Sequence, residues 1–291
     1  MRAKEIPLVF GCRGEKLVGI IHHAEGGSKI GVLLVVGGPQ YRVGSHRQFV
    51  LLARHLASQG IPVMRFDVRG MGDSEGEQRS FADLDDDIAA AVDCLLTSCP
   101  ELDGVVLWGL CDAASAALFY GYQDSRVKGM VLLNPWVFTE QGAAKTVLKH
   151  YYLRRLLSKD FWLKIIAFKF DYAHSLASLF NLLKQASAKN ETSKTIEASV
   201  KVDENLALPI RMRECFRRFT APVLLILSGR DLTADEFKET VKGDPEWQTL
   251  INDSRVTRRD FNEADHTFSS EAWREQVARW TSDWINTLDR Q

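Results

Sequence analysis

The sequence predicts a chain of the α/β class, with a mostly parallel central sheet covered by helices on both faces. Apolar runs rich in β-branched residues, such as 30–36 and 104–109, are typical of strands that are buried on both faces. Segments with apolar residues at helical spacing follow these runs, and glycines or charged loops separate the two kinds of segment. Strands that alternate with helices in this way form parallel sheets.

Strand and helix patterns follow one another along the whole chain. Two short strand-like runs, 6–10 and 16–23, are separated by glycine-containing turn residues and predict an N-terminal hairpin. Further apolar runs predict strands at 30–36, 62–66, 104–109, 128–134, 222–228 and 255–261. Apolar residues at helical spacing predict helices at 49–60, around 88–95, directly after the strand at 104–109, and at 271–288.

Composition narrows the class of function. The chain has 291 residues, of which 45% are hydrophobic, and a formal net charge of −1. Nucleic-acid binding normally needs a basic excess, so we expect no nucleic-acid partner. The first residues reach glycine and charge before any long apolar run, and no stretch approaches the length of a membrane span, so we expect a cytoplasmic protein.

The cysteines predict neither disulfides nor a metal site. They are odd in number, scattered along the chain and without paired metal spacing: Cys12, Cys94, Cys99, Cys111 and Cys215. The sequence also lacks a phosphate-binding loop, a dinucleotide fingerprint after a strand, and a histidine-rich metal set. We therefore expect reduced thiols, no metal and no cofactor.

A long segment interrupts the alternation of strands and helices. It is far longer than an ordinary crossover, so we expect a core domain at 1–135 and 211–291 and a helical lid inserted at 136–210. Residues 141–184 have a helix-forming composition with eight Lys or Arg against two Asp. Such a basic amphipathic segment could contact the inner membrane peripherally, although a helix docked on its own domain is the commoner case.

The junction at residues 108–114 carries the main chemical signal. A buried strand ends at Gly109, Cys111 follows two residues later, and Ala113 lies two residues after it in a segment of helical character. This is the nucleophile-elbow pattern G-x-S-x-G with cysteine for serine and alanine for the last glycine. The start of the helix favours a thiolate at Cys111. The alternative interpretation is a small buried hydrophobic residue, the commonest fate of a lone cysteine.

Two later residues stand where an acid and a base would be needed. Asp231 follows the strand at 222–228, and His266 lies in a loop before the last helix. The order nucleophile, acid, histidine is that of the α/β-hydrolase fold. Taken alone, Asp231 would be a helix cap and His266 a surface residue. Asp265 and Asp235 are weaker candidates for the acid.

Two segments carry a resemblance to a known family. VVGGPQYRVGSHRQFVLLARHLASQGIPVMRFDVRGMGDSEG at 35–76 and WGLCDAASAA at 108–117 resemble α/β hydrolases, and within them the exosortase A system-associated hydrolases, group 1, of bacterial exopolysaccharide loci. The resemblance implies an α/β-hydrolase fold and a hydrolase associated with polysaccharide export and protein sorting. The chain departs from common hydrolases because no histidine precedes Gly37.

The residues predict acyl transfer through a thioester on Cys111, with His266 as base and Asp231 as its orienting acid. The oxyanion would need two N–H donors. The N–H of Asp112 is one, and because Pro39 has no N–H, Gln40 is the first choice for the other and Gly38 the second. Arg42 and His46 follow this loop and could contact an anionic substrate, although solvation of a helix start explains them equally well.

The substrate is expected to be an ester or thioester, because thiolates attack these groups readily. We expect it to be a small-molecule or lipid-linked acyl compound. Two alternatives stay open. An acyltransferase would use the same triad if a hydroxyl or amine intercepted the thioester. A non-catalytic binding module of the export machinery would need no triad at all.

Overall fold

The computed structural model describes residues 4–24, 27–38, 40–138 and 201–289. Its centre is an 8-stranded sheet with the order β1-β2-β4-β3-β5-β6-β7-β8. Only the pairs β1–β2 and β2–β4 are antiparallel among the paired strands, and the others run parallel. The predicted class and the mostly parallel sheet are confirmed.

The strands are β1 Lys4–Cys12, β2 Glu15–His23, β3 Ile30–Val35, β4 Val63–Phe66, β5 Gly104–Leu110, β6 Val127–Leu133, β7 Val223–Arg230 and β8 Val256–Asp265. The α-helices are α1 Gln48–Ser58, α2 Asp85–Ser98, α3 Asp112–Gly121, α8 Leu208–Arg218, α9 Leu232–Gly243, α10 Pro245–Ile251 and α11 Glu271–Leu288. Two 3-10 helices, η1 Ser45–Arg47 and η2 Phe81–Asp83, lie in the connections.

The N-terminal hairpin shows how local sequence fixes an element. Arg13 and Gly14 join β1 to β2 with positive φ angles of 53° and 89°. Two consecutive positive φ angles are the signature of the tight turns that match the twist of paired strands, and glycine adopts them without strain. The predicted hairpin is therefore present.

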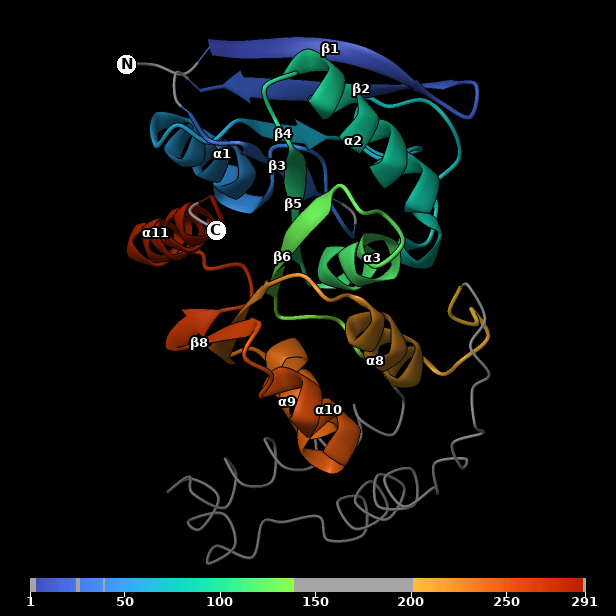
Figure 1. Ribbon diagram of the computed structural model, residues 1–291, viewed down its shortest axis with the longest axis vertical. Helices are drawn as coiled ribbons and strands as arrows, with labels where there is room; N and C mark the ends of the chain where they lie inside the picture. The colour runs from blue at the N-terminus through green and yellow to red at the C-terminus, as the bar shows by residue number, and fades with distance from the viewer. Residues whose placement is uncertain (1–3, 25–26, 39, 139–200, 290–291) are drawn as a thin grey trace, which may run out of the picture.

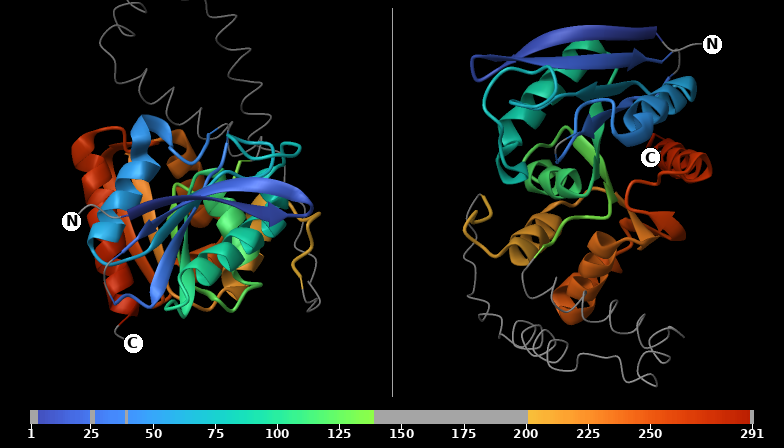
Figure 2. Two further views of the ribbon diagram at one scale, coloured as in Figure 1. Left: turned by 90° about the horizontal axis from the view of Figure 1, so that it is seen from above. Right: turned by 180° about the vertical axis from the view of Figure 1, so that it is seen from behind.

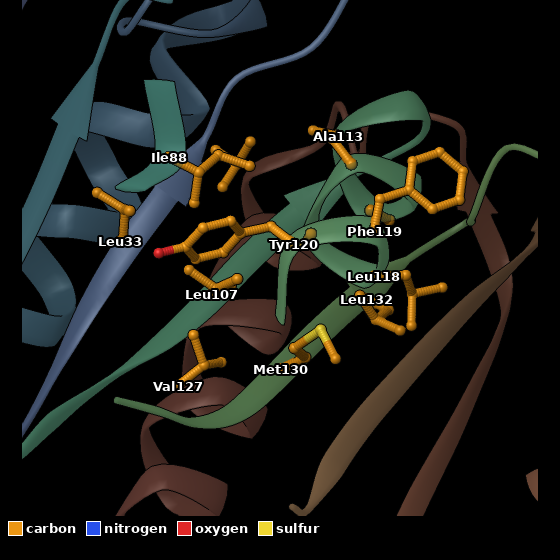
Figure 3. Packing of buried hydrophobic residues seen from close by; sticks show 14 of the residues in the cluster. Leu33, Ile88, Leu107, Ala113, Leu118, Phe119, Tyr120, Val127, Met130 and Leu132 are labelled. Carbon is orange, nitrogen blue, oxygen red and sulfur yellow. The ribbon is translucent and has the colours of Figure 1, made fainter. Parts of the chain in front are cut away.

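Helices cover both faces of the sheet, as Figures 1 and 2 show. The helices α1 and α11 pack together on one face, and α2, α3 and α8 lie on the other. Two buried clusters correspond to these layers, one on each side of the strands. Figure 3 shows α3 packed over the sheet, with Tyr120 beside Leu107 of β5 and Leu118 beside Leu132 of β6. This burial holds the start of α3 rigidly at the end of β5.

Most of the predicted insertion, residues 139–200, lies outside the described residues, so the lid and its boundaries stay a prediction. At its far end, Val202 is buried in the core cluster and its N–H donates to the Tyr122 hydroxyl at 2.9 Å. Helix α8 begins at Leu208, three residues before the predicted boundary. In the described parts of the chain, no helix is long and apolar enough to cross a membrane.

Candidate active site

Cys111 stands at the turn between β5 and α3. Its φ of 63° and ψ of −124° are unusual for a residue that has a side chain. The turn is held by the Cys111 N–H, which donates to the Leu133 carbonyl at 2.9 Å, and by the Cys111 carbonyl, which accepts from the Trp136 N–H at 3.2 Å. Strained backbone of this kind persists only where its surroundings impose it, and it is common at active sites.

Gly109 explains why the elbow needs a glycine before the nucleophile. A Cβ added there would lie 2.5 Å from the Ala113 carbonyl oxygen and 2.7 Å from the Ala114 nitrogen. These are backbone atoms of the first turn of α3 and cannot turn aside. The glycine of the G-x-C-x-A motif is therefore required by the close approach of strand and helix.

The structure brings the side chains of His266 and Asp231 together. The Nδ1 atom of His266 lies 2.9 Å from Oδ2 of Asp231, and the Asp231 side chain is 6% exposed. The hydrogen bond to Asp231 and then the contact with Cys111 raise the pKa of His266 to about 10. Because Nδ1 is engaged by Asp231, Nε2 is the ring nitrogen left for the sulfur.

Asp231 also caps a helix. Its two carboxylate oxygens accept from the N–H groups of Thr233 and Ala234, each at 3.1 Å, at the start of α9. The cap and the contact with His266 thus coexist in one side chain. The other two acids point elsewhere, since Asp265 accepts from the Ser269 N–H at 2.9 Å and Asp235 lies 3.3 Å from the Lys238 ammonium.

Asn134, which the sequence reasoning missed, fixes the loop that carries His266. It is fully buried at the end of β6, and its Nδ2 donates to Ser228 Oγ at 2.9 Å and to the His266 carbonyl at 3.2 Å. Its Oδ1 accepts from the Ser228 N–H at 2.8 Å, and Ser228 Oγ donates to the Asp265 carbonyl at 2.9 Å. The sequence signal that could have indicated Asn134 is a polar residue directly after a buried strand.

Cys111 is more accessible than three of the other four thiols. Cys12, Cys99 and Cys215 are buried, whereas Cys111 and Cys94 are partly accessible, and burial raises the pKa of Cys94. Burial raises the pKa of Cys99 to about 11 and that of Cys215 to about 12. Thiols of this kind are poor nucleophiles near neutral pH.

A cavity of about 320 Å³ opens at Cys111. The residues that line it are Gly37, Gly38, Gln40, Phe49, Phe81, Leu110, Cys111, Asp112, Trp136 and His266. Away from the reacting centre, four of the lining side chains are aromatic or aliphatic: Phe49, Phe81, Leu110 and Trp136. The cavity therefore offers an apolar surface beside the sulfur and the imidazole.

The loop after β3 and the start of α3 meet through the Asp112 side chain. Its Oδ2 accepts from the Gly38 N–H at 2.7 Å, and its Oδ1 accepts from the Ala113 N–H at 2.9 Å. Burial raises the pKa of Asp112 even though these hydrogen bonds lower it. Gln40 lines the same cavity, and its Oε1 lies 3.4 Å from the Ser45 N–H. Pro39 is outside the described residues.

The two expected substrate contacts are not brought to this cavity, because neither Arg42 nor His46 is among its described lining residues. Arg42 instead forms an ion pair with Asp67, which is fully buried, and another with Asp73 at 2.6 Å. Its backbone N–H donates to Asp67 at 2.6 Å. His46 lies in η1 with a φ of 52°. Arg42 thus ties its loop to the loop that follows β4.

Arg69 forms a buried ion pair in the loop that follows β4. Its guanidinium contacts both oxygens of the buried Asp87, with the shortest distance 2.7 Å. Among the residues that the structure describes, no group of three or more His, Cys, Asp or Glu side chains is arranged to hold a metal ion.

Several solved structures share the fold of this chain. The Pyrococcus furiosus esterase Pf2001 has a TM-score of 0.64 at 16% identity, over 98% of this chain and 91% of that one. Est1E from Butyrivibrio proteoclasticus, solved with bound ferulic acid, has a TM-score of 0.63 at 14% identity, over 98% and 100%. A putative hydrolase from Agrobacterium vitis S4 has a TM-score of 0.57 at 13% identity, over 98% and 100%. At such identities, the likeness establishes the fold alone.

Sequence comparison gives the family. No curated protein matches the chain. A family model described as Serine aminopeptidase, S33, matches residues 31–266, which run from β3 to the histidine of the site. The match spans most of the chain and agrees with the α/β-hydrolase fold of its structural neighbours. The chain therefore belongs to the Hydrolase_4 family of serine aminopeptidase S33 proteins, within the α/β hydrolases.

Proposed function

We propose that the chain hydrolyses an ester or thioester through a covalent acyl-enzyme on Cys111. One observation carries the proposal: the strained Cys111 contacts His266, whose other ring nitrogen lies 2.9 Å from the buried Asp231. A nucleophile, a base and an orienting acid in this order and geometry are what acyl transfer needs. The nucleophile is cysteine, although the family description names a serine enzyme.

The reaction follows from these positions. The Cys111 thiolate attacks the carbonyl carbon, and the oxyanion accepts hydrogen bonds from backbone N–H groups. We assign one donor to Asp112, the residue after the nucleophile. For the other we prefer Gly38 to Gln40, the first choice from the sequence, because the Gly38 N–H is directed at the Asp112 carboxylate beside Cys111. On collapse, the leaving group departs with its electron pair and takes a proton from the His266 imidazolium. Neutral His266 then removes a proton from water, whose oxygen attacks the thioester and releases the acid and the thiolate.

The walls of the cavity indicate the acyl group. Phe49, Phe81, Leu110 and Trp136 give it an apolar surface. A cavity of about 320 Å³ suits a small apolar acyl group, whose burial contributes roughly 25 cal/mol per Å² of apolar surface. We therefore propose neutral acyl donors, and esters and thioesters over amides because thiolates are weak toward unactivated amides.

A panel of p-nitrophenyl esters and acyl thioesters tests the proposal, with turnover and intact mass followed together. We expect an adduct of the acyl mass on the wild type and neither adduct nor turnover with Cys111→Ala. Cys215→Ala is the matched control, because it removes a buried thiol that should not react. An adduct that persisted in Cys111→Ala would contradict the assigned nucleophile.

Adding an alcohol or amine acceptor to the same assay separates hydrolysis from acyl transfer. Hydrolysis predicts free acid as the main product at all acceptor concentrations, whereas a transferase would divert the acyl group to the acceptor. Binding of acyl donors without adduct or turnover would favour the non-catalytic module.

The cellular setting rests on sequence resemblance. We propose a cytoplasmic enzyme associated with exopolysaccharide export. For the basic segment at 141–184, docking on its own domain is the commoner case, and peripheral contact with the inner membrane is the alternative. Salt-sensitive binding to anionic liposomes that is lost when the lysines of 141–184 are replaced would support the membrane contact. Binding that is unchanged by these replacements would exclude it.

A further inference from the structure

One of the assigned oxyanion donors, the Gly38 N–H, already has an acceptor, the side chain of Asp112. The Asp112 carboxylate accepts from the Gly38 N–H at 2.7 Å and from the Ala113 N–H at 2.9 Å. The carboxylate and a substrate oxyanion therefore compete for the Gly38 N–H.

The site is shaped to fit this carboxylate. A Cβ built on Gly37 would collide with Asp112 Oδ1 and would lie 2.7 Å from the Ala113 nitrogen. The missing side chain of Gly37 thus leaves the space that the carboxylate occupies. The neighbouring Gly38 has a φ of 59°, which directs its N–H toward the start of α3 and suits glycine. Both glycines are needed for the contact between loop and carboxylate.

Burial raises the pKa of Asp112. This effect is larger than the opposite effect of its hydrogen bonds and of the nearby His266. A side chain placed in this way is held by directed bonds but is not deeply stabilised as an anion. The Asp112 carboxylate can leave the Gly38 N–H by rotation about the side-chain bonds of Asp112. A carbonyl oxygen can therefore replace the carboxylate at the Gly38 N–H without movement of α3.

We propose that Asp112 is a specificity-determining residue, whose carboxylate acts as an internal ligand of the oxyanion site that an acyl donor must displace before Cys111 can be acylated. The proposal rests on the proposed acyl-transfer function. It predicts that reactions with a tetrahedral oxyanion are slowed by Asp112, whereas reactions without one are not. Only acyl donors that bind the Gly38 N–H well enough to compete would react quickly.

The test compares two reactions of the same sulfur. Iodoacetamide alkylates Cys111 by displacement of iodide and forms no oxyanion. p-Nitrophenyl acetate acylates it, forming the S–C bond and releasing p-nitrophenolate with the electron pair of the broken C–O bond. Both reactions need the thiolate, so the ratio of their rate constants cancels the thiolate fraction. Rates would be measured by intact mass for wild type, Asp112→Ala and Asp112→Asn.

We expect the ratio of acylation to alkylation to rise about tenfold or more in Asp112→Ala, since one oxyanion donor is typically worth about 10²–10³ in rate. Asp112→Asn should give a smaller rise, because a neutral amide oxygen competes less strongly for the Gly38 N–H. Asp85→Asn is the matched control, since Asp85 is also the first residue of a helix and burial raises its pKa. Its ratio should equal that of the wild type.

The outcomes separate the two proposals. Acylation confined to the Asp112 variants, or faster in them, supports the internal ligand. If the wild type is acylated and the ratio of acylation to alkylation is unchanged or lower in the Asp112 variants, the internal-ligand proposal is overturned. The proposed acyl hydrolase is then unaffected. Alkylation without acylation in every variant overturns both. If Asp112→Ala fails to fold, the ratio in Asp112→Asn decides in the same way.

Discussion

The carboxylate of Asp231 joins a helix to a histidine: it caps α9 through the N–H groups of Thr233 and Ala234 while its Oδ2 lies 2.9 Å from His266 Nδ1. The helix cap fixes the carboxylate before any substrate is present, and the fixed carboxylate fixes the imidazole ring. A residue that looks like an ordinary cap therefore also determines which nitrogen of His266 faces Cys111.

Substitutions at Asp231 should separate these two roles. Asp231→Asn keeps a capping side chain, so we expect little change in the free energy of unfolding but a fall in kcat of about 10⁴, because the histidine loses its orienting acid. Asp231→Ala should also lose about 1 kcal/mol of stability. Ser270→Ala, which removes the α11 cap formed with the Trp273 N–H, is the control for capping. Equal activity of Asp231→Asn and wild type would contradict the triad.

Asn134 should act on activity through the position of His266. Asn134→Ala leaves the Ser228 N–H and the His266 carbonyl without this partner. We expect a loss of about 1–3 kcal/mol in unfolding free energy, together with a lower kcat at nearly unchanged KM. Chemical denaturation and steady-state kinetics measure the two effects. Ser228→Ala removes the two hydrogen bonds of the hydroxyl, with Asn134 Nδ2 and the Asp265 carbonyl, but keeps the Asn134–His266 contact and should lower kcat less.

Gly109→Ala should damage the elbow. Its Cβ would meet backbone atoms of Ala113 and Ala114, so we expect a loss of about 1–3 kcal/mol of stability, or failure to fold. Gly243→Ala is the matched control, because no atom lies within 4 Å of its Cβ position. That substitution should stabilise the protein by about 0.4–1 kcal/mol. Similar melting temperatures for the two variants would contradict the close contact between β5 and α3.

The pKa of His266 gives a pH dependence of stability. Because this pKa is raised from 6.5 to about 10, the folded chain holds the proton more tightly than the unfolded chain does. The resulting stabilisation is fully present below pH 6.5 and is lost as the pH rises through about 10. The difference in melting temperature between wild type and His266→Gln should therefore shrink across this window. A constant difference would show that His266 is not held as a cation.

Arg42 should prove to be structural. Its loss would leave the fully buried Asp67 without its guanidinium partner, so Arg42→Ala should cost about 3–5 kcal/mol in unfolding free energy. KM for neutral acyl donors should hardly change in the protein that remains folded. Arg54→Ala, which breaks an exposed pair with Glu5, should cost at most about 1 kcal/mol. A large rise in KM with normal stability would restore the predicted substrate contact.

The sequence by itself determined the order of the strands along the chain and the three residues of the candidate triad. Burial on both faces leaves a continuous apolar pattern, as in β3 and β5, and the elbow leaves small residues at fixed distances from Cys111. The short helix α10 and the amphipathic helix α8 were not predicted.

Only the tertiary structure decided the partners of the polar groups. Nothing local places Asn134 beside Ser228, since 94 residues separate them, or Arg42 beside Asp67. The same holds for Asp112: its backbone N–H could be assigned from its position after the nucleophile, but its carboxylate meets Gly38 only because β3 and β5 are neighbours in the sheet. Apolar periodicity is a local property of the chain, whereas a hydrogen bond between distant segments depends on how the whole sheet is assembled.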